Sequence, residues 1–176
     1  MNKAWLGVAA FTFIAFNTYG DPPIYLADNF DGHGYELIPT PTPWHIAKKK
    51  ADQNGGYLVV ITSPEENEFI MELIKKATKG GTCQAWLGLS DEKKEGDWRW
   101  INSEKVSFNY WSAGQPDNYN NAENFACFVT RTDGLRWNDH SGDARTAYIV
   151  EYDHEITSDT STETSGPARP KIRSTR

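Results

Sequence analysis

The chain has 176 residues, with 24 acidic side chains against 18 lysines and arginines and a formal net charge of −6. This length predicts one domain with short tails rather than several domains. The acidic balance argues against nucleic acid as a partner, because binding to phosphates requires a basic face.

Residues 1–20 have the pattern of a signal peptide. Lys3 supplies a positive start, and the apolar run 4–16 that follows is too short to span a bilayer. The alternative is a helix buried in the fold, which the polar turn at 21–23 disfavours. No second apolar run reaches membrane length, so we expect a secreted, extracellular protein with no membrane insertion.

Two helices are expected in the first half of the folded part. The first begins at Pro43 and ends before the glycine pair at 55–56. The second begins at Ser63 as its N-cap, followed by a proline at the first helical position and two glutamates at the positive end of the helix dipole. The apolar run 57–61 between the helices predicts a buried strand.

After Gly81 the sequence reads as short strands and turns, and two helices followed by strands predict an α+β fold. This half is rich in tryptophan, which we interpret as aromatic packing in the core. The tryptophans concerned are Trp86, Trp98, Trp100 and Trp111.

The domain boundaries follow from composition. We expect an N-terminal segment at 21–34, the folded domain at 35–155 and a disordered tail at 156–176. The tail is rich in serine and threonine and has almost no apolar residues, so it cannot bury enough surface to fold alone. Its four basic residues leave two interpretations open, a tether to an acidic matrix or a solvated tail.

Side-chain oxygens gather in a Gly/Asn-rich segment of the second half. The residues that carry them are Gln115, Asp117, Glu123, Asn138 and Asp139. Carboxylates and side-chain amides are the ligands of calcium, which takes six to eight oxygens in a flexible site. A calcium ion with open positions can bind something else, so this segment is the candidate functional site.

Several motifs resemble those of C-type lectin domains. Gln-Pro-Asp at 115–117, with a glutamate six residues after its aspartate, and Trp-Asn-Asp at 137–139 resemble that family's long-loop calcium site. Trp-Leu-Gly-Leu at 86–89 and Tyr-Ile-Val-Glu at 148–151 resemble two of its core strands, and the resemblance covers 35–152. It implies the C-type lectin-like fold, two helices packed on antiparallel sheets with a long calcium-binding loop.

The resemblance also implies a ligand. In that family the bond before the proline is cis, the five oxygen-bearing residues hold the principal calcium, and two adjacent sugar hydroxyls complete its coordination shell. The order Gln-Pro-Asp goes with galactose-type sugars. Tyr119, two residues after Asp117, either stacks on the apolar face of galactose or is a solvent-exposed loop tyrosine. The implied carbohydrate-binding residues are Gln115, Asp117, Tyr119, Glu123, Asn138 and Asp139.

A second, auxiliary calcium site is implied in the same way. Asp91 and Glu95 resemble its acidic ligands, joined by Glu123 and by Asn118, where an acid is common in the family. The alternative is a charged hairpin in water.

The two cysteines depart from the family pattern, because none of the positions of its two usual disulfides is cysteine here. In an oxidising compartment a pair is favoured over two free thiols, so we expect a Cys83–Cys127 disulfide. The alternative is two buried thiols.

Two functions remain open. The first is a calcium-dependent lectin for galactose-type glycans, which would need multivalency, for example as a homo-oligomer, because single sites are weak. The second is a C-type-lectin-like module that binds protein or extracellular matrix without sugar. We do not expect an enzyme, because no nucleophile motif is present and the histidines are scattered: His33, His45, His140 and His154.

Overall fold

The computed structural model describes residues 26–103 and 105–156. The expected signal peptide at 1–20 and all but the first residue of the expected tail lie outside this part of the chain. Within the described residues, no helix combines the length and the apolar composition that a membrane span requires.

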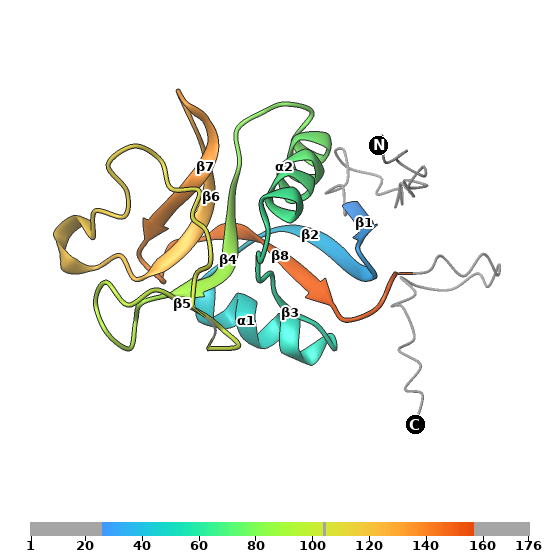
Figure 1. Cartoon of the computed structure of the whole chain (residues 1–176), viewed down its shortest axis with the longest axis horizontal. Coiled ribbons are helices and arrows are strands. Elements are labelled where there is room, and N and C mark those ends of the chain that lie inside the picture. The colour runs from blue at the N-terminus through green and yellow to red at the C-terminus, as the bar shows by residue number, and fades with distance from the viewer. Residues whose placement is uncertain (1–25, 104, 157–176) are drawn as a thin grey trace.

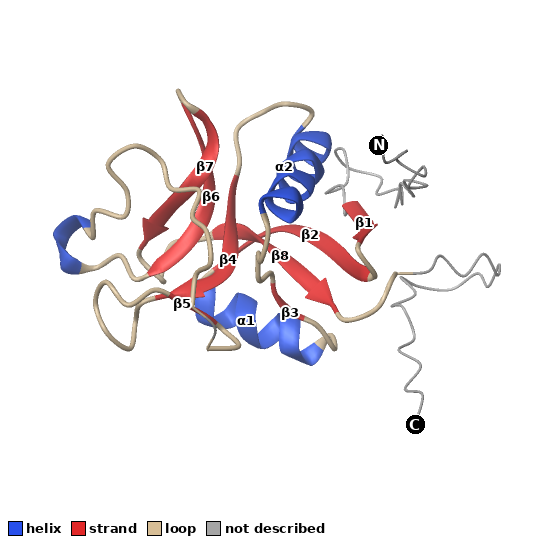
Figure 2. Ribbon diagram, in the orientation of Figure 1, coloured by secondary structure: helices blue, strands red, loops and turns tan. Residues whose placement is uncertain are grey.

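One eight-stranded sheet forms the centre of the fold, with the long helix α2 against it and α1 beneath one end (Figures 1 and 2). The strand order is β1-β2-β8-β4-β6-β7, with β3 paired to β8 and β5 paired to β4. The strand pairs are antiparallel except for β4 with β8. This confirms the α+β class, and the parallel β4–β8 pair makes the sheet mixed rather than purely antiparallel. The elements are β1 Leu26–Phe30, β2 His33–Thr42, α1 Trp44–Gln53, β3 Tyr57–Leu58, α2 Pro64–Thr78, β4 Gln84–Ser90, β5 Arg99–Trp100, the 3-10 turn Tyr119–Asn121, β6 Phe125–Arg131, β7 Gly134–His140 and β8 Thr146–Tyr152.

Both predicted helix starts are confirmed. Helix α1 begins directly after Pro43, and its C-cap residue Asn54 precedes the glycine pair. Helix α2 begins at Pro64, and the side chain of Ser63 accepts a hydrogen bond of 3.1 Å from the amide of Glu66. An N-cap bond of this kind satisfies one of the free amides of the first turn.

The predicted strand at 57–61 is shorter than expected. Only Tyr57–Leu58 pairs as β3, although the next three residues are also buried. The reason is the amide of Val60, which donates to Glu151 Oε2 at 2.9 Å instead of to a strand carbonyl. A buried side chain therefore replaces the ladder at this point.

The hairpin of β1 and β2 lies partly in the segment 21–34 that the sequence suggested to precede the domain. Its turn is the Asp31-Gly32 pair, with φ angles of 49° and 85°. Two consecutive positive φ angles are typical of the tight hairpin turns that favour Asp-Gly. The hairpin adds an edge strand to the sheet, so the ordered sheet begins at Leu26.

The tryptophans pack as predicted. Trp86 is fully buried and Trp100 nearly so, while Trp98 and Trp111 are half-buried with ring centroids 4.8 Å apart. Trp137 is also fully buried, and its indole N–H donates to Asn67 Oδ1 at 3.0 Å. A large ring with a satisfied N–H fixes β7 against α2.

The expected Cys83–Cys127 disulfide is wrong, because both residues are free cysteines. Cys127 lies opposite Trp86 across β4 and β6, whereas Cys83 lies opposite Thr130, from whose amide its carbonyl accepts at 3.0 Å. Three residues of strand separate the two positions by about 10 Å, beyond the Cα distance that a disulfide can bridge. Burial raises the pKa of Cys83 to about 11 and that of Cys127 still further.

We therefore expect two titratable thiols per chain when the unreduced protein is unfolded in denaturant. In the folded protein both should react slowly with a thiol reagent at neutral pH, since little of either is thiolate. A colorimetric thiol count before and after unfolding measures this. A count of zero in denaturant would contradict the arrangement of the two strands.

Candidate metal and ligand site

A long loop between β5 and β6 carries most of the predicted ligands (Figure 1). Strand β7 holds the middle of this loop, because the Ser112 amide donates to the Trp137 carbonyl at 2.8 Å and the Trp137 amide donates to the Tyr110 carbonyl at 2.9 Å. The Gln115–Pro116 peptide bond is cis, as the resemblance implied. The loop is thus attached to the strand that ends in the other two predicted ligands.

Asp139 on β7 is the carboxylate that positions the loop. Its side chain is fully buried, its Oδ2 accepts from the Asn118 amide at 2.7 Å, and its Oδ1 accepts from the Asp117 amide at 3.3 Å. Two loop amides therefore converge on a carboxylate of the sheet, which fixes the backbone just after the cis-proline.

Three of the predicted ligands come together. Carboxylate oxygens of Asp117, Glu123 and Asp139 all lie within 4.8 Å of one another. Glu123 is held by the amide of Tyr119, which donates to its Oε2 at 3.2 Å. Burial raises the pKa of Glu123, and the negative charges of Asp139 and Asp117 raise it further. Such crowding of carboxylates disfavours their ionised forms unless a cation lies between them.

Gln115 supplies the clearest test of whether a cation fits. Its Oε1 is buried and has no hydrogen-bond partner among the described residues. A buried acceptor without a donor costs free energy, and a cation beside the acidic cluster would satisfy it. The donor set of an amide oxygen and three carboxylates is the kind that calcium prefers.

Asn138 differs from the other predicted ligands. Its Oδ1 accepts a hydrogen bond from the guanidinium of Arg131, and its Nδ2 donates to the Asp139 carbonyl. Its amide oxygen is thus engaged by a cation of the chain itself. Sequence reasoning missed Arg131, because only the register of the β6–β7 hairpin brings it to Asn138.

The residues of the predicted auxiliary site are also close to the loop. Asn118 Nδ2 donates to Glu95 Oε2 at 2.5 Å. Asp91 is buried, with its Oδ2 accepting from the Gly96 amide at 2.8 Å and its Oδ1 without a partner among the described residues. Burial raises the pKa of Asp91, and the charges of Glu95 and Asp139 add to this.

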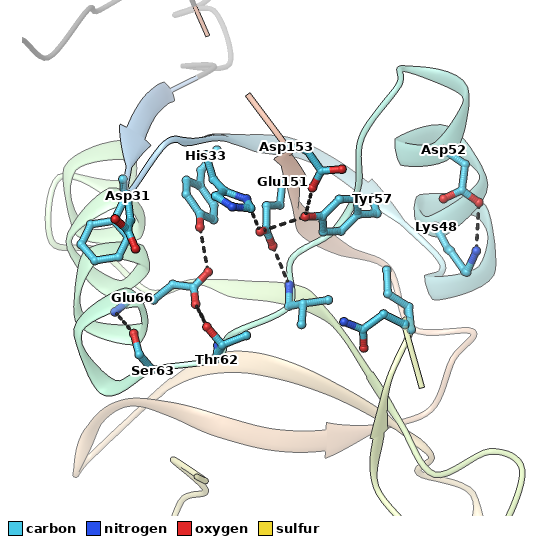
Figure 3. A pocket seen from close by; sticks show the side chains of 15 residues that line it. Asp31, His33, Lys48, Asp52, Tyr57, Thr62, Ser63, Glu66, Glu151 and Asp153 are labelled. Carbon is cyan, nitrogen blue, oxygen red and sulfur yellow. Dashed lines mark hydrogen bonds and ion pairs between the residues drawn. The ribbon is translucent and has the colours of Figure 1, made fainter. Parts of the chain in front are cut away.

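A second acidic centre lies apart from the Asp117–Glu123–Asp139 cluster, in a cavity of about 590 Å³ between the β1–β2 hairpin and the two helices (Figure 3). Glu66 Oε1 accepts from the Tyr35 hydroxyl at 2.7 Å, and its Oε2 accepts from the Thr62 amide at 2.8 Å. Glu151 accepts from the Tyr57 hydroxyl at 3.0 Å and lies 2.9 Å from His33 Nδ1. Burial, with the charge of Glu66, raises the pKa of Glu151 to about 7.

These two glutamates hold the backbone that joins β3 to α2. Val60 and Thr62, two residues of that link, each donate their amide to one of the carboxylates. Because each of the four carboxylate oxygens has a donor or a histidine nitrogen beside it, the pocket has a structural role that needs no added cation.

Comparisons with known proteins agree with the fold. The model of the Lectin C-type domain family matches residues 40–151. A perlucin-like protein of Mytilus galloprovincialis is 44% identical over 90 residues, covering 51% of this chain and 57% of that protein. An alpha-N-acetylgalactosamine-specific lectin of Patiria pectinifera is 37% identical over 97 residues, covering 54% and 57%. The chain therefore spans a little over half the length of these curated relatives.

Among solved structures, the C-type lectin CEL-I from Cucumaria echinata matches with a TM-score of 0.64 at 30% sequence identity. The match covers 71% of this chain and 93% of that one. This likeness confirms the expected C-type lectin-like fold.

Neutralising one acid of the cluster should stabilise the metal-free protein. In EDTA at neutral pH, we expect Glu123→Gln to raise the thermal midpoint by a few degrees, because it removes repulsion from Asp117 and Asp139 while the Tyr119 amide keeps an acceptor. The pKa of Glu123 in the folded protein lies above its ordinary value, so ionisation of Glu123 destabilises the fold. This loss of stability develops as the pH rises through that pKa. The advantage of the variant should therefore vanish in acid.

Thermal melts in EDTA across pH measure this effect. The matched control is Glu68→Gln, which removes an exposed acid of α2 and should leave the midpoint unchanged. Equal midpoints for Glu123→Gln and the parent chain at neutral pH would mean that the three carboxylates do not repel one another.

Proposed function

The chain belongs to the C-type lectin domain family, and on this premise we propose that it is a secreted, calcium-dependent lectin for galactose-type sugars. The observation that carries the proposal is the cluster of Asp117, Glu123 and Asp139, with ligand oxygens within 4.8 Å of one another. Strand β7 and the long loop hold these acids without a neutralising lysine or arginine in contact with their carboxylates among the described residues.

The proposed site uses five side chains as ligands of the principal calcium: Gln115, Asp117, Glu123, Asn138 and Asp139. Bound calcium supplies open coordination positions for two neighbouring hydroxyls of a sugar. The acids of the site accept hydrogen bonds from those hydroxyls, and the amide of Gln115 donates to them. Three carboxylates leave the site with a net negative charge around a doubly charged ion, which retains the metal at neutral pH.

The choice of galactose-type sugars rests on three observations. The order Gln-Pro-Asp resembles the galactose-type pattern of the family, and a relative is named for specificity toward alpha-N-acetylgalactosamine, a sugar of that type. Tyr119 is 67% exposed beside the acidic cluster, so its ring is free to stack on the apolar face of a galactose ring.

An auxiliary calcium is part of the same proposal. Asp91, Glu95 and Asn118 are its ligands, and the buried Asp91 Oδ1 without a hydrogen-bond donor supports a cation there. A cation bound to Asp91, Glu95 and Asn118 would join the long loop to the turn that follows β4 and so stabilise the position of the loop.

The proposal is tested by passing the purified protein over a dense galactose resin in calcium, beside a mannose resin. A dense resin compensates for the weak affinity of single sites, whether or not the chain forms a homo-oligomer. We expect retention on galactose that EDTA or free galactose releases. If neither the galactose resin nor the mannose resin retains the protein in calcium, a module that binds protein or matrix would be favoured instead.

The sugar preference should follow the order of amide and acid around Pro116. We expect the double variant Gln115→Glu with Asp117→Asn to move retention from galactose toward mannose, because it reverses the donor and acceptor order across the site. The variant keeps the net charge of the loop, so calcium titration should change little and serves as the control. Undiminished preference for galactose would show that these two residues do not contact the sugar.

A further inference from the structure

Arg131 is a cation placed against a predicted ligand. It is the last residue of β6, it is exposed, and its guanidinium donates to Asn138 Oδ1. Among the described residues, it is the only lysine or arginine found in contact with any of the five proposed ligands. The other contact with a titratable base is His140 Nδ1, 3.6 Å from Glu123 Oε1.

The strand register explains this placement. Asn138 lies opposite Cys127 in the β6–β7 hairpin, and alternate residues of β6 put Arg131 on the same face as Cys127. Burial raises the pKa of Cys127 and the charge of Arg131 opposes that rise, as expected for a guanidinium that reaches back along this face. The backbone of Arg131 is thus at the turn of the hairpin, and its guanidinium reaches back to Asn138 at the proposed site.

A cation bound at the site competes with Arg131. The Oδ1 of Asn138 would serve the metal, and a guanidinium is repelled by a doubly charged ion a few ångströms away. Arg131 would then lose its contact with Asn138, and its five N–H donors would be free for a ligand bound at the same site. A planar guanidinium in this position matches an oxyanion in two parallel hydrogen bonds.

Resting on the proposed lectin function, we propose that Arg131 is a specificity-determining residue that selects galactose-type sugars carrying an anionic substituent, a sulfate ester or a carboxylate. The three clustered carboxylates carry three negative charges, and a bound doubly charged ion would leave a net charge of about −1. This net charge alone repels an anionic sugar. Arg131 reverses this local repulsion. Neutral galactose still binds, since its hydroxyls do not use the guanidinium.

The first experiment measures calcium binding without sugar by titration calorimetry. Arg131→Gln should bind calcium several-fold more tightly than the parent chain, because the competing guanidinium is gone. The matched control is Arg136→Gln on the same hairpin, whose guanidinium lies 4.2 Å from the centre of the Tyr110 ring and away from the proposed ligands. Equal calcium affinities for Arg131→Gln and the parent chain would overturn the competition between Arg131 and the metal.

The second experiment compares methyl galactoside with its 2-sulfate, its 6-sulfate and methyl galacturonide in calcium at low salt. These substituents leave the neighbouring 3- and 4-hydroxyls free to complete the calcium coordination. Comparing the sulfates with the galacturonide shows which of the two anions is preferred. We expect at least one anionic sugar to bind about fivefold more tightly than the neutral one, in the range of a single exposed ion pair. The preference should disappear in Arg131→Gln, remain in Arg136→Gln, survive in part in Arg131→Lys, and weaken with salt.

The outcomes separate this inference from the lectin function. Retention of neutral galactose in calcium without a preference for any anionic sugar, or with a preference that Arg131→Gln keeps, overturns the role of Arg131 and leaves the proposed function standing. Binding of the anionic sugar that EDTA does not release also overturns it. Binding of no galactoside at all, neutral or anionic, overturns both.

Discussion

The buried carboxylate of Asp139 is the contact on which the candidate site depends. A charge of this kind is costly to bury unless hydrogen bonds compensate it, and here the amides of Asp117 and Asn118 do so. The same two bonds fix the loop backbone directly after the cis-proline. The position of the loop acids is thus set by a residue of the sheet, and the loop keeps its geometry without either of the family's usual disulfides.

Strand β7 can carry this contact because Trp137 fixes its register. The ring of Trp137 is fully buried, and its N–H is satisfied by Asn67 of α2, so the strand cannot slide by one residue without exposing one of the two fully buried tryptophans. Successive side chains of a strand point to opposite faces. Burial of Trp137 on one face therefore directs Asn138 to the face on which Arg131 lies.

Local signals in the sequence predicted local structure well. Helix caps and turns are decided by neighbouring residues, so Ser63 was enough to predict the start of α2. In the same way, Gln115 and Asp117 on either side of a proline were enough to locate a turn in the loop. The prediction of a disulfide was wrong because the pairing of β4 with β6 keeps Cys83 and Cys127 apart. The spacing of the two cysteines along the chain does not encode this register. The contact of Arg131 depends on the same kind of long-range register and was missed for the same reason.

The two acidic centres of this domain differ in how completely the surrounding chain satisfies their hydrogen-bond acceptors. In the pocket, both oxygens of Glu66 accept hydrogen bonds from the chain, and burial there stabilises a backbone link. At the candidate calcium sites, by contrast, Gln115 Oε1 and Asp91 Oδ1 are buried without a donor among the described residues, and the charges of Glu95 and Asp139 act on Asp91. Acceptors that the chain leaves unsatisfied next to concentrated negative charge are what a cation relieves. Hydrogen-bond satisfaction, more than acidity, thus distinguishes the structural centre from the one that we propose binds calcium and, through it, sugar.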